Sequence, residues 1–193
     1  QNEIPRVLGQ PVFGTGMYPG WMGAAPTFSD PRPPGPNPDD PGRGPIDQVQ
    51  GRWNGIHMVG DRAVLSYTVQ GTDVLEQPGS VAVNGEVGIT RTVQTEATAR
   101  PLTLVAAEVR NAATAEQSSN AVVLEHGAAP DTVTAVGVVQ PREGATLQAV
   151  DGRYVTFQLP NDAPAATFRL VLWTGPRTAL PAFRSMLDGP VEG

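Results

Sequence analysis

Two histidines, His57 and His126, are the residues of this sequence best suited to acid–base chemistry or metal binding. Each has an acidic residue nearby: Asp61 lies four positions after His57, and Glu125 directly precedes His126. A metal ion needs convergent ligands, and successive residues of a regular strand point to opposite faces, so Glu125 and His126 cannot both bind one ion. We therefore predict no metal site and no cofactor, and we keep His57 only as a candidate ligand-binding residue.

Charged residues in the first half of the chain form a second group of candidates, namely Asp61, Arg62, Glu76 and Arg91. The paired N–H groups of an arginine can recognise a hydroxylated ligand with defined geometry. The same residues could instead form an ion-pair network that ties hairpin turns together. The structural network is the interpretation that we favour.

Aromatic side chains could stack on a sugar ring or on a side chain of a partner. Trp53, Trp173 and Tyr67 are the candidates, although such residues more often belong to a core, because each buries about 150 to 250 Å². The ligand-binding residues that the sequence predicts are Trp53, His57, Tyr67 and Arg91.

Several catalytic chemistries lack the residues that they need. The chain has no cysteine, which excludes disulfides, thiolate nucleophiles, zinc–thiolate sites and covalently attached c-type haem. It has no Gly-x-Ser-x-Gly motif, and Ser66 falls inside an expected strand. Gly14-Thr-Gly16 lacks the strand–turn–helix context of a dinucleotide-binding loop. We predict that this protein is not an enzyme and has no catalytic residues.

The composition of the chain limits which partners it can bind and where in the cell it is expected. Net charge is −6 without a basic patch, so the sequence lacks the electrostatic attraction on which most nucleic-acid binding depends. No apolar run is long enough to span a membrane. The sequence begins with Gln1 rather than methionine. We expect a signal peptide to have been removed and the protein to be periplasmic or extracellular.

Residues 1–50 are expected to form an extended arm. Residues 30–45 are about half proline, which favours polyproline II conformation. A plain linker would have no use for the large apolar residues that precede this run. We predict that the arm binds a partner through Phe13, Tyr18, Trp21, Met22 and Phe28.

Residues 51–193 are predicted to form an antiparallel, all-β, sandwich-like domain. Alternation and β-branched residues predict a hairpin with strands at 63–69 and 74–76, turning at 71–73. Further strands are expected at 87–94, 102–109, 121–125, 132–139, 154–159 and 167–173. Offsets of three and four between Leu180, Phe183 and Leu187 predict a short C-terminal helix over 179–187. Residues 112–119 are a weaker helix candidate.

Three stretches of sequence together resemble a known family. They are Gly51–Val69, with G-D-R-x-V-L-S-Y-x-V in its second half; Leu75-Glu-Gln-Pro-Gly79 followed by Ile89-Thr-Arg-Thr92; and Phe168–Gly175 followed by Phe183. Their order and spacing resemble the N-terminal β domain of large secreted bacterial proteins similar to glucose or sorbosone dehydrogenases. In that family a β-propeller and a c-type haem domain usually follow. The resemblance implies a redox context and assigns no catalytic residue.

These observations lead to one function hypothesis and one alternative. We predict a non-catalytic accessory or assembly module that docks through its arm onto a larger redox or membrane-bound complex. The complexes expected to bind it contain cytochromes, and photosynthetic complexes are included among them. The alternative is a carbohydrate-binding module associated with sugar dehydrogenases.

Overall fold

A computed structural model describes residues 20–24, 26–30, 32 and 46–191. Two of the predicted partner-binding residues, Phe13 and Tyr18, lie outside the described residues. Among the described residues, no helix has the length and apolar character needed to cross a membrane.

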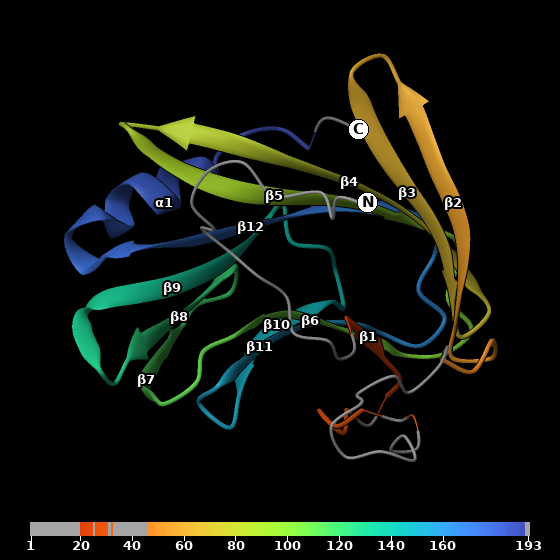
Figure 1. Ribbon diagram of the computed structural model, residues 1–193, viewed down its shortest axis with the longest axis horizontal. Helices are drawn as coiled ribbons and strands as arrows, with labels where there is room; N and C mark the ends of the chain where they lie inside the picture. The colour runs from red at the N-terminus through yellow and green to blue at the C-terminus, as the bar shows by residue number, and fades with distance from the viewer. Residues whose placement is uncertain (1–19, 25, 31, 33–45, 192–193) are drawn as a thin grey trace, which may run out of the picture.

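Two antiparallel sheets form the described domain (Figure 1). The large sheet has eight strands in the order β2 (Gly51–Val59), β3 (Arg62–Val69), β4 (Thr72–Val83), β5 (Glu86–Thr95), β12 (Ala166–Pro176), β9 (Ala129–Val139), β8 (Ala121–His126) and β7 (Ala112–Gln117). The small sheet has four strands in the order β1 (Trp21–Met22), β6 (Leu102–Glu108), β11 (Tyr154–Leu159) and β10 (Thr146–Val150). The predicted all-β class is confirmed.

The main core lies between the two sheets. Its buried residues come from strands β3 to β6 and β8 to β12, mostly at alternate positions, because alternate side chains of a strand point to the same face. Phe157 of β11 meets Phe168 of β12 with ring centroids 4.6 Å apart, and both side chains are fully buried. We call the core-facing side of the large sheet its inner face.

The hairpin predicted around residues 63–76 is present as β3 and β4, with its turn one position earlier than expected. Gln70 and Gly71 occupy the turn and both have positive φ, 47° and 86°. This geometry matches the twist of the flanking strands, and Gly71 adopts it without steric cost.

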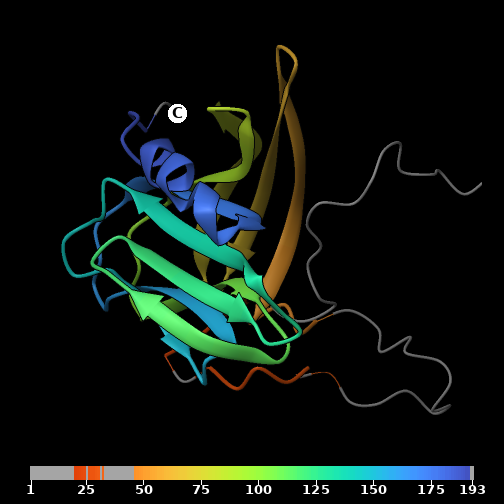
Figure 2. The same ribbon diagram turned by 90° about the vertical axis from the view of Figure 1, so that its left-hand side faces the viewer.

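The predicted C-terminal helix is confirmed as α1 (Leu180–Met186), which follows a short 3₁₀ turn at Arg177–Ala179. It packs on the outer face of the large sheet (Figure 2), where it forms a second apolar cluster with β8, β9 and β12. Phe183 stacks on Trp173 at 6.0 Å, and Trp173 Nε1 donates a hydrogen bond to Glu86 Oε2 at 2.9 Å. Trp173 is therefore a core residue and is not available for stacking on a ligand.

The weaker helix candidate over 112–119 is wrong. Residues Ala112–Gln117 form β7, which pairs with β8 at one end of the large sheet. Alanine favours a helix by intrinsic propensity, but the backbone bonds offered by β8 outweigh that small preference.

The β2–β3 hairpin extends away from the rest of the sheet. β3 pairs with β4 only from Leu65 opposite Glu76 to Val69 opposite Thr72, so the two strands diverge beyond Leu65 and Glu76. Figure 1 shows the β2–β3 hairpin standing apart from β4 and β5.

Replacing Phe183 with alanine tests the contribution of α1. Its side chain is fully buried, so Phe183→Ala should lower the free energy of unfolding by about 3–5 kcal/mol. Urea denaturation would measure the change. The exposed neighbour Arg184 supplies the control, because Arg184→Ala removes little buried surface; equal losses in the two variants would contradict the packing described here.

Candidate functional site

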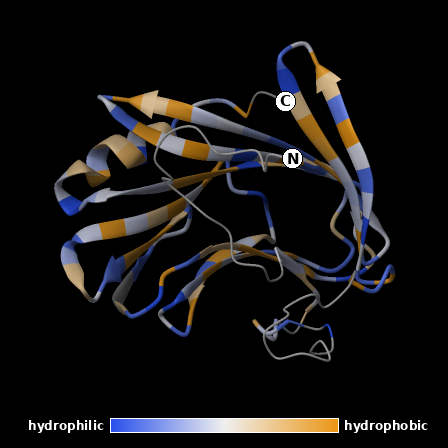
Figure 3. Ribbon diagram, in the orientation of Figure 1, coloured by the Kyte–Doolittle hydropathy of each residue, from blue (hydrophilic) through white to orange (hydrophobic). Residues whose placement is uncertain are grey.

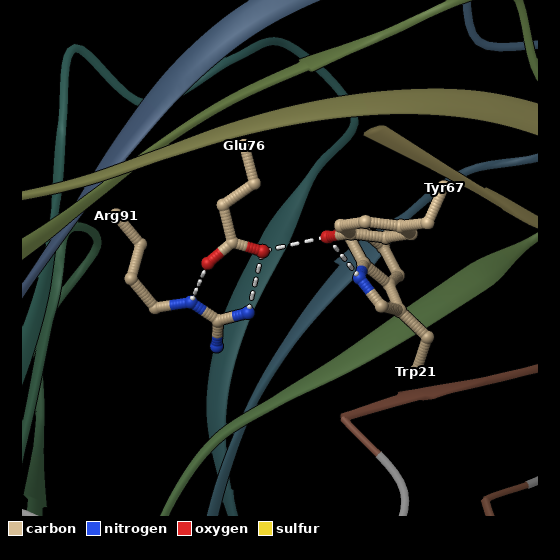
Figure 4. Close-up of polar contacts among 4 residues, drawn as sticks. All are labelled: Trp21, Tyr67, Glu76 and Arg91. Atoms are coloured by element: carbon tan, nitrogen blue, oxygen red, sulfur yellow. Dashed lines mark hydrogen bonds and ion pairs between the residues drawn. The ribbon is translucent and has the colours of Figure 1, made fainter. Parts of the chain in front are cut away.

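A polar cluster lies at the point where β3 and β4 diverge (Figure 4). Glu76 of β4 accepts hydrogen bonds from Arg91 of β5, with Nε to Oε1 at 2.6 Å and Nη2 to Oε2 at 3.0 Å. Tyr67 of β3 donates its hydroxyl to Glu76 Oε2 at 2.6 Å, and Trp21 of β1 donates Nε1 to the Tyr67 hydroxyl at 3.0 Å. Four strands from both sheets therefore meet in one hydrogen-bonded chain.

The strand period places these side chains on the inner face. Tyr67, Glu76 and Arg91 each lie two positions from a buried core valine, which are Val69, Val74 and Val93. Their position at the end of the core explains why the Glu76 side chain is buried and the Arg91 side chain retains some exposure.

The contacts within the cluster shift the pKa values of its members. Burial by itself raises the pKa of Glu76, but the hydrogen bonds and charge of Arg91 outweigh it, so the net pKa is lowered. Burial lowers the pKa of Arg91 and the contacts with Glu76 raise it, with a net increase. Burial, followed by the negative charge of Glu76, raises the pKa of Tyr67 well above its usual value.

These shifts favour a structural role. Glu76 is held as a carboxylate whose oxygens already accept three hydrogen bonds, which makes it a poor general base. Tyr67 keeps its proton at neutral pH, and its hydroxyl is engaged on both sides. The ion pair links β4 to β5, while Tyr67 and Trp21 link it to β3 and β1.

The structure brings together only part of the predicted charged group. Glu76 and Arg91 form the ion pair, whereas Asp61 and Arg62 are exposed at the β2–β3 turn. Of the predicted ligand-binding residues, Trp53 lies opposite Tyr67 in the β2–β3 register, so both are on the inner face. His57 is exposed and lies opposite Val64, on the outer face.

His57 instead borders a shallow groove of about 400 Å³ on the outer face. Strands β2 to β5 and β12 line it with Val59, Val64, Leu75, Gln77, Thr92, Gln94 and Thr167 in addition to His57. Within the described ranges no three His, Asp or Glu side chains converge as metal ligands. His126 Nε2 lies 2.9 Å from Thr134 Oγ1, and Glu125 pairs with Arg177 instead.

Three predicted arm residues contact the domain of their own chain. Met22 is 7% exposed, and Trp21 packs against the main core. Phe28 stacks on Tyr154 at 4.0 Å between ring centroids, and Arg153 lies over the Tyr154 ring at 4.9 Å. Trp21, Met22 and Phe28 are therefore anchored on the β domain.

The inner side of β2 carries an exposed apolar surface that the sequence analysis did not identify. Trp53 is 59% exposed, Ile56 58% and Met58 66%. The register places Ile56 opposite Leu65 and Met58 opposite Ala63, on the same face as Trp53 opposite Tyr67, because an irregularity between Trp53 and Gly55 shifts the alternation. Hydrophobic positions recur along this hairpin in Figure 3. We call Trp53, Ile56 and Met58 the β2 apolar surface.

The ion pair makes a testable contribution to stability. Glu76→Gln leaves the Arg91 charge without its counter-ion, and about 3 kcal/mol of unfolding free energy should be lost at pH 7. The folded-state pKa of Glu76 is below its ordinary value of 4.5, so its stabilisation is present above pH 4.5 and is lost as the pH falls through the folded-state pKa.

Denaturation of the wild type and Glu76→Gln at a series of pH values would measure this linkage. The difference between them should shrink as the pH drops below 4.5. The exposed Asp61 provides a control, since Asp61→Asn should have a small effect at neutral pH. A wild-type advantage that did not change with acidification would contradict the assignment.

The first part of the chain is similar to a known domain family. Residues 1–76 match the family model of a domain of unknown function, DUF6797. The matched segment includes β1, β2 and β3, and β4 as far as Glu76. No curated protein sequence matches the chain.

Proposed function

We propose that this protein is a non-catalytic docking module and that the β2 apolar surface is its principal contact with a partner protein. One observation carries the proposal. Trp53, Ile56 and Met58 lie on one face of one strand, and each is more than half exposed. Clustered exposed apolar side chains mark interaction sites, whereas isolated ones are common on any surface.

The composition of this surface favours a protein over a sugar as its ligand. Tryptophan and methionine are enriched in protein interfaces. A sugar site needs hydrogen-bonding groups beside the aromatic ring, but Ile56 and Met58 are apolar. The nearest polar groups on this face, those of Tyr67 and Glu76, are already engaged with each other.

The redox context of the proposal rests on the sequence resemblance. In the secreted proteins that the sequence resembles, the N-terminal β domain is usually followed by a β-propeller and a c-type haem domain. We propose that this chain docks onto such a redox assembly, or onto a membrane-bound cytochrome complex, in the periplasm or outside the cell. Its contribution would be shape and contact surface.

We also propose that the arm binds a partner, although part of the arm, β1, belongs to the small sheet. Because Trp21 and Met22 pair with β6, removing the whole arm would also remove a strand of the small sheet. A deletion that tests partner binding by the arm should therefore stop at residue 19 and keep β1.

The β2 apolar surface should be required for assembly in the native host. A Trp53→Ser, Met58→Ser double variant should lose most of the proteins that co-purify with the wild type, as measured by native purification and mass spectrometry. Its thermal stability should change little, because both side chains are largely exposed.

Val87→Ser is the matched control for this experiment. Val87 is 54% exposed but belongs to β5, away from β2. An unchanged set of partners in the double variant would refute this function for the β2 apolar surface.

Carbohydrate binding is the second candidate function, and it has one observation in its favour. Trp53 is exposed on the same face as Tyr67 and Arg91, three of the four residues predicted to bind a ligand. Calorimetric titration with mono- and oligosaccharides should give no heat of binding if protein docking is the correct function. Saturable heat that disappears in Trp53→Ala would favour the sugar.

A further inference from the structure

β2 is a long strand at the edge of the large sheet. Within the described part of the chain it pairs only with β3, so one side of its nine residues offers backbone N–H and C=O groups without a neighbouring strand. A row of this kind is a template for another strand, and native proteins usually shorten, charge or cover it.

The turn geometry shows which residues present these groups. Val59 and Arg62 flank the two-residue turn of the β2–β3 hairpin, and such flanking residues form a hydrogen-bonded pair. Residues alternate from there, so Met58 and Ile56 direct their N–H and C=O groups toward the free edge. The same two residues carry apolar side chains on the inner face.

The strand at the opposite end of the large sheet, β7, is tied to neighbouring elements by its side chains. In β7, Glu116 Oε1 accepts a hydrogen bond from Arg177 at 2.6 Å, and Gln117 Oε1 accepts one from the backbone N–H of Ala149 at 3.1 Å. These contacts tie β7 to the C-terminal segment and to β10. Among the residues that the structure describes, no comparable contact ties down the free edge of β2.

The charge of the β2–β3 hairpin indicates which kind of strand could pair with the free edge of β2. Residues 51–69 contain Arg52, Arg62 and Asp61, a net charge of +1, whereas the whole chain carries −6 and the remainder therefore −7. Arg52 donates to Asn54 at 3.0 Å, and in the described ranges no carboxylate lies within ion-pair distance of Arg52 or Arg62. Arg52 lies opposite Thr68 and Arg62 opposite Val59, which places both on the outer face.

We propose that the free edge of β2 accepts an extended strand of a partner polypeptide, with apolar residues on its inner side and carboxylates on its outer side. The inner residues extend the β2 apolar surface, and the carboxylates meet Arg52 and Arg62. Backbone hydrogen bonds along the edge supply affinity, and side-chain alternation sets the register. This inference rests on the proposed docking function and specifies how the partner binds.

A blocked peptide tests the proposal directly. The probe is acetyl-Glu-Val-Thr-Val-Thr-Val-Thr-Val-Glu-amide, which matches the nine residues of β2 in length and has all valines on one face. In NMR titrations it should shift the backbone amides of residues 51–59 and slow hydrogen exchange at Ile56 and Met58. The same peptide with lysine in place of glutamate should bind about tenfold more weakly at low salt.

Two protein variants separate edge pairing from side-chain contact. Met58→Pro removes one edge-facing N–H while leaving the bonds to β3, so it should abolish most peptide binding; Met58→Val keeps the N–H and should retain binding. If Met58→Pro does not fold, the exchange measurement on the wild-type protein decides alone.

Failure of this inference can be distinguished from failure of the docking function. No binding at millimolar peptide, or binding without slower exchange in β2, would overturn strand addition. If the Trp53→Ser, Met58→Ser double variant still lost its native partners in that case, docking through the apolar surface would stand. Unchanged native partners would overturn the docking function itself.

Discussion

Unequal width of the two sheets is the constraint from which the other features of this domain follow. The large sheet has eight strands and the small sheet four, so the small sheet can cover only part of the inner face. β12, β9 and β8 lie over the small sheet and supply the fully buried core side chains Phe168, Val136 and Leu124. β2 lies at the far end, beyond this cover, and its inner side chains face solvent.

The ion pair of Glu76 and Arg91 marks the boundary between the covered and uncovered parts. An apolar side chain there would enlarge the exposed patch, whereas an isolated charge would be costly to bury. The bidentate pair, whose carboxylate also accepts a hydrogen bond from Tyr67, lies at the end of the core. Its polar groups tolerate partial hydration there. Because Trp21 joins the same chain of hydrogen bonds, the arm is anchored where the hairpin begins to diverge.

The sequence predicted elements whose signal is local and missed those that depend on distant pairing. Strands such as β5 and β12 were predicted within two or three residues, because β-branched and aromatic residues dominate them. β1 has only two residues and exists through its pairing with β6. Glu76 and Arg91 were recognised as candidates, but the register of β4 against β5 decides that they meet while Asp61 and Arg62 do not. Ile56 and Met58 were missed because apolar alternation looks the same whether or not another layer covers the strand.

The exposed apolar residues of β2 support the docking role proposed for the β2–β3 hairpin. Burial cannot account for apolar residues at Trp53, Ile56 and Met58, since each is more than half exposed, and polar residues there would reduce the risk of association at the edge. The C-terminal segment shows how this fold covers apolar surface on the outer face. Phe183 of α1 packs on Trp173, and Leu187, which follows α1, packs against Gly137. No such element lies over β2 among the described residues, and the polar cluster at its base holds the hairpin in place without using its apolar side chains. A strand that is held by the fold yet contributes little to the core is well placed to supply contact energy to a partner.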